Sequence, residues 1–153
     1  MKIYLAAPLF SVAERTYNKV VAGEIGEVAD VFLPQDSGLL LMDLLATGVN
    51  LGDAYKLIFD ADWAAVQASD MLVAILDGAC VDDGVAVEIG LARASNIVCI
   101  GLKTDWRTQL PTGDNPMVVG ALLKIFTSLD QLVKYIHDVD NDSAYVAPVD
   151  LVR

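Results

Sequence analysis

Residues 71–92 read MLVAILDGACVDDGVAVEIGLA, and the order of residue types in this stretch decides the fold. The first six residues form a continuous apolar run, which is typical of a strand that is covered on both faces. Residues 77–84 are rich in Asp and Gly and predict a loop. Residues 85–95 carry apolar residues at helical spacing. The stretch therefore predicts a strand, a loop and a helix in that order.

The sequence on either side repeats this alternation. It predicts further strands at 3–7, 31–33, 97–100 and 124–127, and further helices at 12–28, 53–69, 117–123 and 128–138. Asp53 is the expected N-cap of the second of these helices. Residues 39–52 carry leucines and glycines, and their pattern leaves their state open, with a partly helical lid as one alternative.

Strands that alternate with helices favour a parallel sheet with helices on both faces. We therefore expect an α/β fold with a single doubly wound, flavodoxin-like five-stranded sheet in the order 2-1-3-4-5. Ligands of such sheets bind where the strand order reverses, so residues 7–14 and 77–84 should frame the site. We expect one domain over residues 1–153, with an extended C-terminal tail from about residue 141.

Charge and hydropathy exclude several classes of partner. The formal net charge is −11 and the sequence pI about 4.2, which opposes nucleic-acid binding, because phosphate contacts need clustered Lys and Arg. No apolar run approaches the roughly 18 residues that a spanning helix needs. We expect a cytoplasmic protein without a membrane partner. Because 55% of the residues are hydrophobic, we also expect a subunit interface.

Cofactor signals are weak throughout the sequence. Cys80 and Cys99 form no CxxC motif, and the single histidine, His137, stands near the C-terminus among acidic residues. Neither GxGxxG nor GxxxxGK occurs, so no phosphate cradle is indicated. We expect no metal, no organic cofactor and no Cys/His catalysis.

Glu88 is the most informative polar residue, because it lies in an otherwise apolar helical segment. A buried carboxylate is costly unless it is paired or used, so Glu88 is either a solvated or paired acid or a reactive group. Asp62 could face it across the cleft, with Asp60 as a competitor, and two such acids suit glycoside chemistry. Tyr4 is either a core aromatic or a donor that orients a buried carboxylate.

Four segments in this order resemble nucleoside 2-deoxyribosyltransferases, over about residues 2–136. They are residues 2–10 (KIYLAAPLF), Asp62 eight residues before Asp70, residues 81–92 (VDDGVAVEIGLA) and residues 114–117 (DNPM). The block at 81–92 is the most specific of them. Spacing alone favours an ordinary Asn-Pro turn for the last segment.

The resemblance implies a role for each catalytic candidate. Glu88 corresponds to the nucleophile that forms a covalent deoxyribosyl intermediate, and Tyr4 to the residue that holds it by a hydrogen bond. Asp62 corresponds to the aspartate that interacts with the nucleobase and supports its proton transfer. No cofactor is implied.

The resemblance also implies a substrate-binding set: Asp82, Asn115, Gln35, Phe10, Leu9 and Met117. Asp82 matches an aspartate that binds a sugar hydroxyl. Asn115 matches an asparagine that reaches the 5′-hydroxyl from a neighbouring subunit, next to Met117 in the same segment. Gln35 matches a base-contacting glutamine, and apolar side chains around the base correspond to Leu9 and Phe10.

The implied reaction is ping-pong transfer of 2-deoxyribose between nucleobases, with slow hydrolysis as a side reaction. Deoxynucleosides and free nucleobases are the expected partners, and the family suggests a homo-oligomer, a hexamer built from dimers with shared active sites. One rival is a 2′-deoxynucleoside 5′-phosphate N-hydrolase that would use Ser11 and Arg15, although Asp82 and Asp83 would repel a phosphate. The other is a non-catalytic nucleoside-binding module.

Overall fold

The computed structural model describes residues 1–141, and its centre is a parallel sheet. The strands are β1 (Lys2–Ala6), β2 (Asp30–Phe32), β3 (Met71–Ile75), β4 (Val98–Leu102) and β5 (Lys124–Phe126). They lie in the order β2-β1-β3-β4-β5, and every neighbouring pair is parallel. The predicted fold class and strand order are confirmed. The predicted tail from about residue 141 lies outside the described residues.

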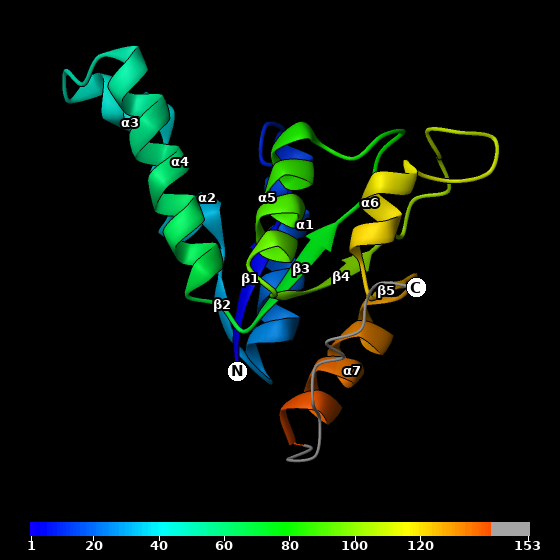
Figure 1. The fold of residues 1–153 in the computed structure, drawn as a ribbon. Helices are drawn as coiled ribbons and strands as arrows, with labels where there is room; N and C mark the ends of the chain where they lie inside the picture. The colour runs from blue at the N-terminus through cyan, green and yellow to red at the C-terminus, as the bar shows by residue number, and fades with distance from the viewer. Residues whose placement is uncertain (142–153) are drawn as a thin grey trace.

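Helices cover both faces of this sheet (Figure 1). They are α1 (Val12–Gly26), α2 (Pro34–Ser37), α3 (Leu41–Ala46), α4 (Leu51–Gln67), α5 (Asp83–Ala94), α6 (Pro116–Ala121) and α7 (Leu129–Asn141). The helices α1 and α7 share one core with the sheet, and α4 and α5 share the other. Figure 1 shows α4 beside α5, with α3 against the end of α4 that lies farther from the sheet. No helix within residues 1–141 is long and apolar enough to cross a membrane.

The alternation of side chains along β1 decides which residues meet which helices. Ile3 and Leu5 enter the core beneath α1 and α7, whereas Tyr4 and Ala6 enter the core beneath α4 and α5. All four of these side chains are fully buried. Tyr4 therefore faces the helix that carries Glu88.

The predicted N-cap of one helix is wrong. The helix α4 begins at Leu51, and its N-cap is Asn50 rather than Asp53. The Asn50 Oδ1 atom accepts the Asp53 backbone N–H at 3.0 Å. Asparagine caps a helix as well as aspartate does, and Asp53 then stands in the first turn, where a negative charge favours the helix dipole. The segment that the sequence left open is partly helical, since it contains α3.

A buried ion pair holds the loop between β4 and α6. The Lys103 Nζ atom lies 3.0 Å from Asp114 Oδ1, and the two side chains are only 10% and 7% exposed. The same Nζ donates a hydrogen bond of 3.3 Å to the Leu76 carbonyl oxygen at the end of β3. Lys103 therefore ties the loop that leads into α6 to the centre of the sheet.

We predict that Lys103→Met lowers the free energy of unfolding by about 3–5 kcal/mol, because it leaves the Asp114 carboxylate buried and unpaired. Urea unfolding at pH 7 measures the loss. Combining Lys103→Met with Asp114→Leu removes both charges and should restore most of the stability. A Lys103→Met variant that is as stable as wild type would contradict a buried ion pair between Lys103 and Asp114.

Candidate active site

A cavity of about 290 Å³ lies at the carboxyl ends of β1 and β3, where the strand order reverses. Asp62, Asp82 and Glu88 supply its carboxyl groups. Most of the remaining wall is apolar and includes Leu9 and Phe10 from the loop after β1. Leu39, Leu40 and Leu41, between α2 and α4, complete the apolar wall together with Ile58. The cavity therefore places carboxyl groups in poorly solvated surroundings.

Glu88 lies on α5 and meets Tyr4 from the sheet. The Tyr4 hydroxyl donates a hydrogen bond of 2.5 Å to Glu88 Oε1. Burial raises the pKa of Glu88 to about 7, the hydrogen bond from Tyr4 opposes this rise, and the nearby Asp62 and Asp82 add to it. Burial and the Glu88 charge hold the pKa of Tyr4 well above its ordinary value, so Tyr4 remains a donor.

Asp62 lies on α4 and lines the same cavity. Burial raises the pKa of Asp62 to about 6. Asp60 points elsewhere, since it is exposed and pairs with Lys56 at 2.5 Å along the same helix. Of the two aspartates that the sequence offered, the structure brings only Asp62 to the cavity.

Asp82 has a structural contact as well as a place in the cavity wall. It is the N-cap of α5, and its Oδ1 atom accepts the backbone N–H groups of Gly84 and Val85 at 2.9 and 3.2 Å. A side chain at Gly84 would place its Cβ 3.1 Å from this oxygen, so a glycine permits the tight cap. The cap thereby fixes one carboxyl group at the N-terminus of the helix that carries Glu88.

The family of this chain follows from comparison with known proteins. Residues 3–133 match the family model described as Nucleoside 2-deoxyribosyltransferase. The chain belongs to this family. Membership indicates an enzyme that acts on N-glycosidic bonds, and the resemblance drawn from the sequence motifs is confirmed. No curated protein matches the chain.

Solved structures share the fold of this deoxyribosyltransferase-family chain. A conserved protein from Enterococcus faecalis V583 has 33% identity and a TM-score of 0.74, over 90% of this chain and 98% of that one. A 2-deoxyribosyltransferase from Bacillus psychrosaccharolyticus has 21% identity and a TM-score of 0.68, over 88% and 92%. A CMP N-glycosidase from Clostridium botulinum has 15% identity and a TM-score of 0.52, over 89% and 98%. The last two support the fold alone.

Three of the residues that the sequence singled out lie away from this cavity in the deoxyribosyltransferase-family chain. Gln35 bonds through both ends of its amide to α1. Asn115 is the N-cap of α6, where its Oδ1 atom accepts the Met117 backbone N–H at 2.9 Å. The Met117 side chain is 83% exposed. The geometry of one chain thus assembles Tyr4, Asp62, Asp82, Glu88, Leu9 and Phe10 without these three.

The sequence missed most of the apolar wall. Ile58 and the run from Leu39 to Leu41 line the cavity, although they are far from β1 and α5 in the sequence. The three consecutive leucines in a segment of undecided structure were the available signal, because such a run needs a partner surface. Within residues 1–141, no group of three or more His, Cys, Asp or Glu side chains could hold a metal ion.

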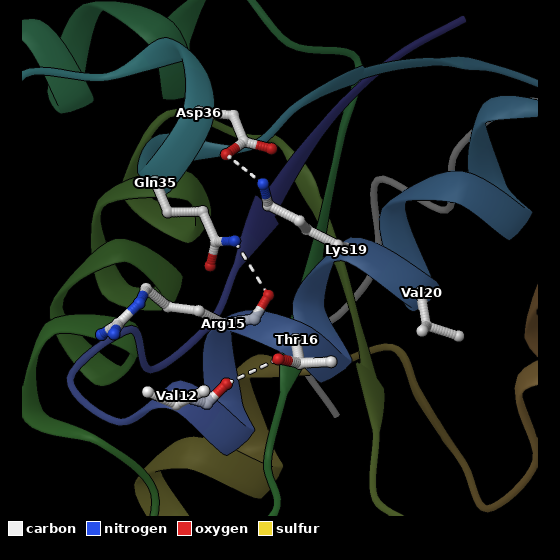
Figure 2. A pocket seen from close by; sticks show the side chains of 7 residues that line it. All are labelled: Val12, Arg15, Thr16, Lys19, Val20, Gln35 and Asp36. Carbon is white, nitrogen blue, oxygen red and sulfur yellow. Dashed lines mark hydrogen bonds and ion pairs between the residues drawn. The ribbon is translucent and has the colours of Figure 1, made fainter.

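A larger cavity, of about 540 Å³, lies between α1 and α2 (Figure 2). Its charged side chains include Lys19 and Asp36, which pair with each other at 3.3 Å. Figure 2 shows the Gln35 amide directed at the backbone carbonyl of Arg15. Size alone does not make this cavity a site, since the one carboxyl group in its described wall, that of Asp36, already pairs with Lys19.

The pKa of Glu88 predicts how stability depends on pH. Glu88 binds its proton more tightly in the fold, at about 7, than at its ordinary value of 4.5. The contribution of Glu88 to the free energy of unfolding is therefore complete below about pH 4.5 and is lost as the pH rises through about 7. Glu88→Gln does not titrate and keeps an oxygen for Tyr4. We predict that this variant is more stable than wild type by roughly 1–3 kcal/mol at pH 8.

Urea unfolding of both proteins at several pH values measures this difference. The difference should shrink towards pH 4, where wild-type Glu88 is protonated in both states. Titrating groups that do not interact with Glu88 cancel, because the two proteins share them. A wild type that gains stability relative to Glu88→Gln between pH 5 and pH 8 would refute the raised pKa.

Proposed function

We propose that this enzyme transfers 2-deoxyribose between nucleobases through a covalent deoxyribosyl-Glu88 intermediate, with slow hydrolysis as a side reaction. The observation that carries the proposal is the Glu88 carboxyl group, which Tyr4 holds at 2.5 Å in a largely apolar cavity that Asp62 also lines. The family match over residues 3–133 supports an N-glycosidic substrate.

In the first half-reaction, the Tyr4 hydroxyl donates its hydrogen bond to Oε1 of Glu88, and Oε2 attacks C1′ of the deoxyribose. The bond from Oε2 to C1′ forms while the bond from C1′ to the base nitrogen breaks. The proton of the Asp62 carboxyl group passes to the departing base. A pKa of about 6 allows Asp62 to hold this proton near neutral pH.

In the second half-reaction, a new base enters between the apolar walls that Leu9, Phe10 and the residues Leu39 to Leu41 form. Its ring nitrogen attacks C1′, the bond to Glu88 breaks, and its proton returns to the Asp62 carboxylate. Two inversions give net retention and ping-pong kinetics. Water that attacks instead releases free deoxyribose, so the apolar walls favour transfer. No step requires a metal or an organic cofactor.

The sugar end of the site draws on Asp82 and on a second subunit. Asp82 uses one oxygen to cap α5, and the other accepts a sugar hydroxyl. Asn115 reaches the 5′-hydroxyl of a nucleoside that is bound in a neighbouring subunit, with Met117 beside it. Exposed apolar side chains on α4 and α6, such as Phe59 (51%) and Met117 (83%), support a homo-oligomer. We propose that it is a cytoplasmic hexamer built from dimers with shared sites.

A 5′-phosphate substrate fits this cavity poorly. The described cavity wall has three carboxyl groups and no Lys, Arg or His side chain. Ser11 is the N-cap of α1 and exchanges hydrogen bonds with Glu14, whose carboxylate would repel a phosphate. The Arg15 Nη1 atom donates to the Leu9 carbonyl oxygen. These contacts favour an uncharged deoxynucleoside over its phosphate.

We predict that the purified protein forms deoxyadenosine from deoxyinosine and adenine, and that Glu88→Ala lowers this rate at least about 10³-fold. Chromatography follows deoxyadenosine and free deoxyribose together. Asp60→Ala is the matched control, because Asp60 is an exposed carboxyl group on the same helix as Asp62 and should retain wild-type activity.

The other outcomes identify the rival functions. Free deoxyribose without deoxyadenosine would indicate a hydrolase. Faster release of base from deoxyinosine 5′-phosphate than from deoxyinosine would indicate the phosphate N-hydrolase. Binding of nucleoside without turnover, unchanged in Glu88→Gln, would indicate a binding module.

We predict a bell-shaped pH profile of kcat/KM with its maximum between about pH 6 and pH 7. Protonation of Glu88 removes the nucleophile on the acid side, and ionisation of Asp62 removes the acid on the alkaline side. The two carboxyl groups influence each other, so the limbs belong to the pair. Asp62→Asn should lower the rate and abolish the alkaline limb, and an unchanged limb would exclude Asp62 as the acid.

Tyr4→Phe tests the link between Tyr4 and Glu88. The variant lacks the hydrogen bond that lowers the pKa of Glu88, and this pKa, at about 7, lies above that of Asp62, at about 6, so the alkaline limb should move to higher pH and the maximum should fall. A limb that stays in place or moves to lower pH would separate Tyr4 from Glu88.

A further inference from the structure

Two loops that form the apolar wall are joined by side chains that do not themselves line the active-site cavity. We define this group as the amide clamp, which consists of Arg15, Asn18 and Gln35. We propose that the amide clamp positions the loops after β1 and β2 and thereby sets the ratio of transfer to hydrolysis. This inference rests on the proposed function.

Asn18 is the centre of the amide clamp. It lies on α1 and is only 1% exposed. Its Nδ2 atom donates hydrogen bonds of 2.8 Å to the Pro8 carbonyl oxygen and 2.9 Å to Gln35 Oε1. Pro8 belongs to the loop after β1, and Gln35 belongs to α2, directly after β2. Because β1 and β2 are parallel neighbours, these loops meet at one edge of the sheet, and Asn18 joins them there.

Gln35 and Arg15 complete the connections. The Gln35 Nε2 atom donates to the Arg15 carbonyl oxygen at 2.9 Å (Figure 2). The Arg15 Nη1 atom donates to the Leu9 carbonyl oxygen at 2.9 Å. Leu9 and Pro34, the neighbours of Pro8 and Gln35 in the chain, both line the active-site cavity. The amide clamp therefore holds the loop after β1 by its backbone carbonyl oxygens and the segment after β2 by the Gln35 side chain.

Both ends of the Gln35 amide are engaged, its oxygen by Asn18 and its nitrogen by Arg15. A contact with the nucleobase would break one of these hydrogen bonds. The geometry therefore gives Gln35 a positioning role in place of the base contact that the resemblance implied.

The remaining atom of Asn18 indicates why an amide stands at this position. Among residues 1–141, Asn18 Oδ1 is buried and has no hydrogen-bond partner. An unpaired buried acceptor costs free energy that an apolar side chain of similar size would avoid. The amide contributes its two donated hydrogen bonds, which are directed at the two loops of the site. The fold thus retains a polar group whose contacts serve the cavity wall.

Loss of these donors would leave the Pro8 carbonyl and Gln35 Oε1 unpaired and let the two loops separate. Water could then reach C1′ of the glycosyl-enzyme more often. Glu88 lies on α5 and Asp62 lies on α4. Among the described residues, neither of them forms a hydrogen bond with the amide clamp. The hydrogen bond between Tyr4 and Glu88 should therefore remain, whereas the entering water should lower the raised pKa values of Glu88 and Asp62 towards their ordinary range.

The test is Asn18→Leu, which retains a side chain of similar size without the donors. We expect free deoxyribose formed per deoxyadenosine to rise on the order of tenfold, with a raised KM for deoxyinosine and a pH profile that remains bell-shaped but lies at lower pH. The ratio of the two products does not depend on how much enzyme is folded, so simple destabilisation would leave it at the wild-type value. A ratio equal to that of wild type overturns the proposal.

Two further variants sharpen the test. Thr16→Ala is the matched control and should keep the wild-type ratio, because the Thr16 hydroxyl donates to the Val12 carbonyl oxygen within α1, its one hydrogen bond among residues 1–141. Gln35→Leu breaks the link between the loops while Asn18 keeps its bond to Pro8, so it serves if Asn18→Leu does not fold. It should raise the ratio in the same direction. A changed base preference with an unchanged ratio would restore Gln35 as a base contact and overturn the proposal.

Hydrogen–deuterium exchange tests the amide clamp independently of catalysis. In Asn18→Leu, backbone amides in residues 9–11 and 35–41 should exchange faster, whereas those of α5 should not. Unchanged exchange, or an equal increase throughout the chain, overturns the proposal even if wild type has no activity. Wild type without turnover, combined with faster exchange in these two loops alone, would defeat the proposed function and support the clamp.

Discussion

Glu88 keeps its carboxyl group in an apolar cavity because Tyr4 donates a hydrogen bond to it from the buried face of β1. Burial raises the pKa of Glu88, and Tyr4 opposes that rise, so the carboxyl group titrates near neutrality. The period of two along the strand directs Tyr4 towards α5. A shift of β1 by one residue would put the phenol beneath α1 and leave Glu88 without its donor.

The rest of the site follows from the strand order. The order reverses between β1 and β3, so the loops that follow these strands diverge and leave room between them. The helices α4 and α5 cover the same face and bring Asp62 and Glu88 to one cavity. On the opposite face, α1 supports the loops after β1 and β2 through Asn18. Chemistry and support thus come from different layers of the fold.

Local patterns predicted much of this arrangement. Apolar runs located the strands, and Glu88 stood out because its neighbours in the helix are apolar. The same patterns chose Asp53 as a helix cap where Asn50 acts, since both residue types cap helices and spacing cannot rank them. Leu39 to Leu41 were seen as a segment of undecided structure, because a short apolar run does not reveal which surface it will cover.

The sequence by itself determined the fold class, the strand order, the family and the acidic residue on which the proposed chemistry depends. These follow from periodicity and from motifs, which are properties of short stretches of chain. Periodicity left open whether Tyr4 meets Glu88 and whether Asp62 or Asp60 faces it, and the family resemblance pointed to Tyr4 and Asp62. The tertiary structure shows the hydrogen bond from Tyr4 to Glu88 and Asp62 in the cavity wall, and it alone decided that Gln35 bonds to Asn18. These contacts join residues on separate elements, and their geometry depends on helix rotation and loop packing, which local sequence patterns do not encode.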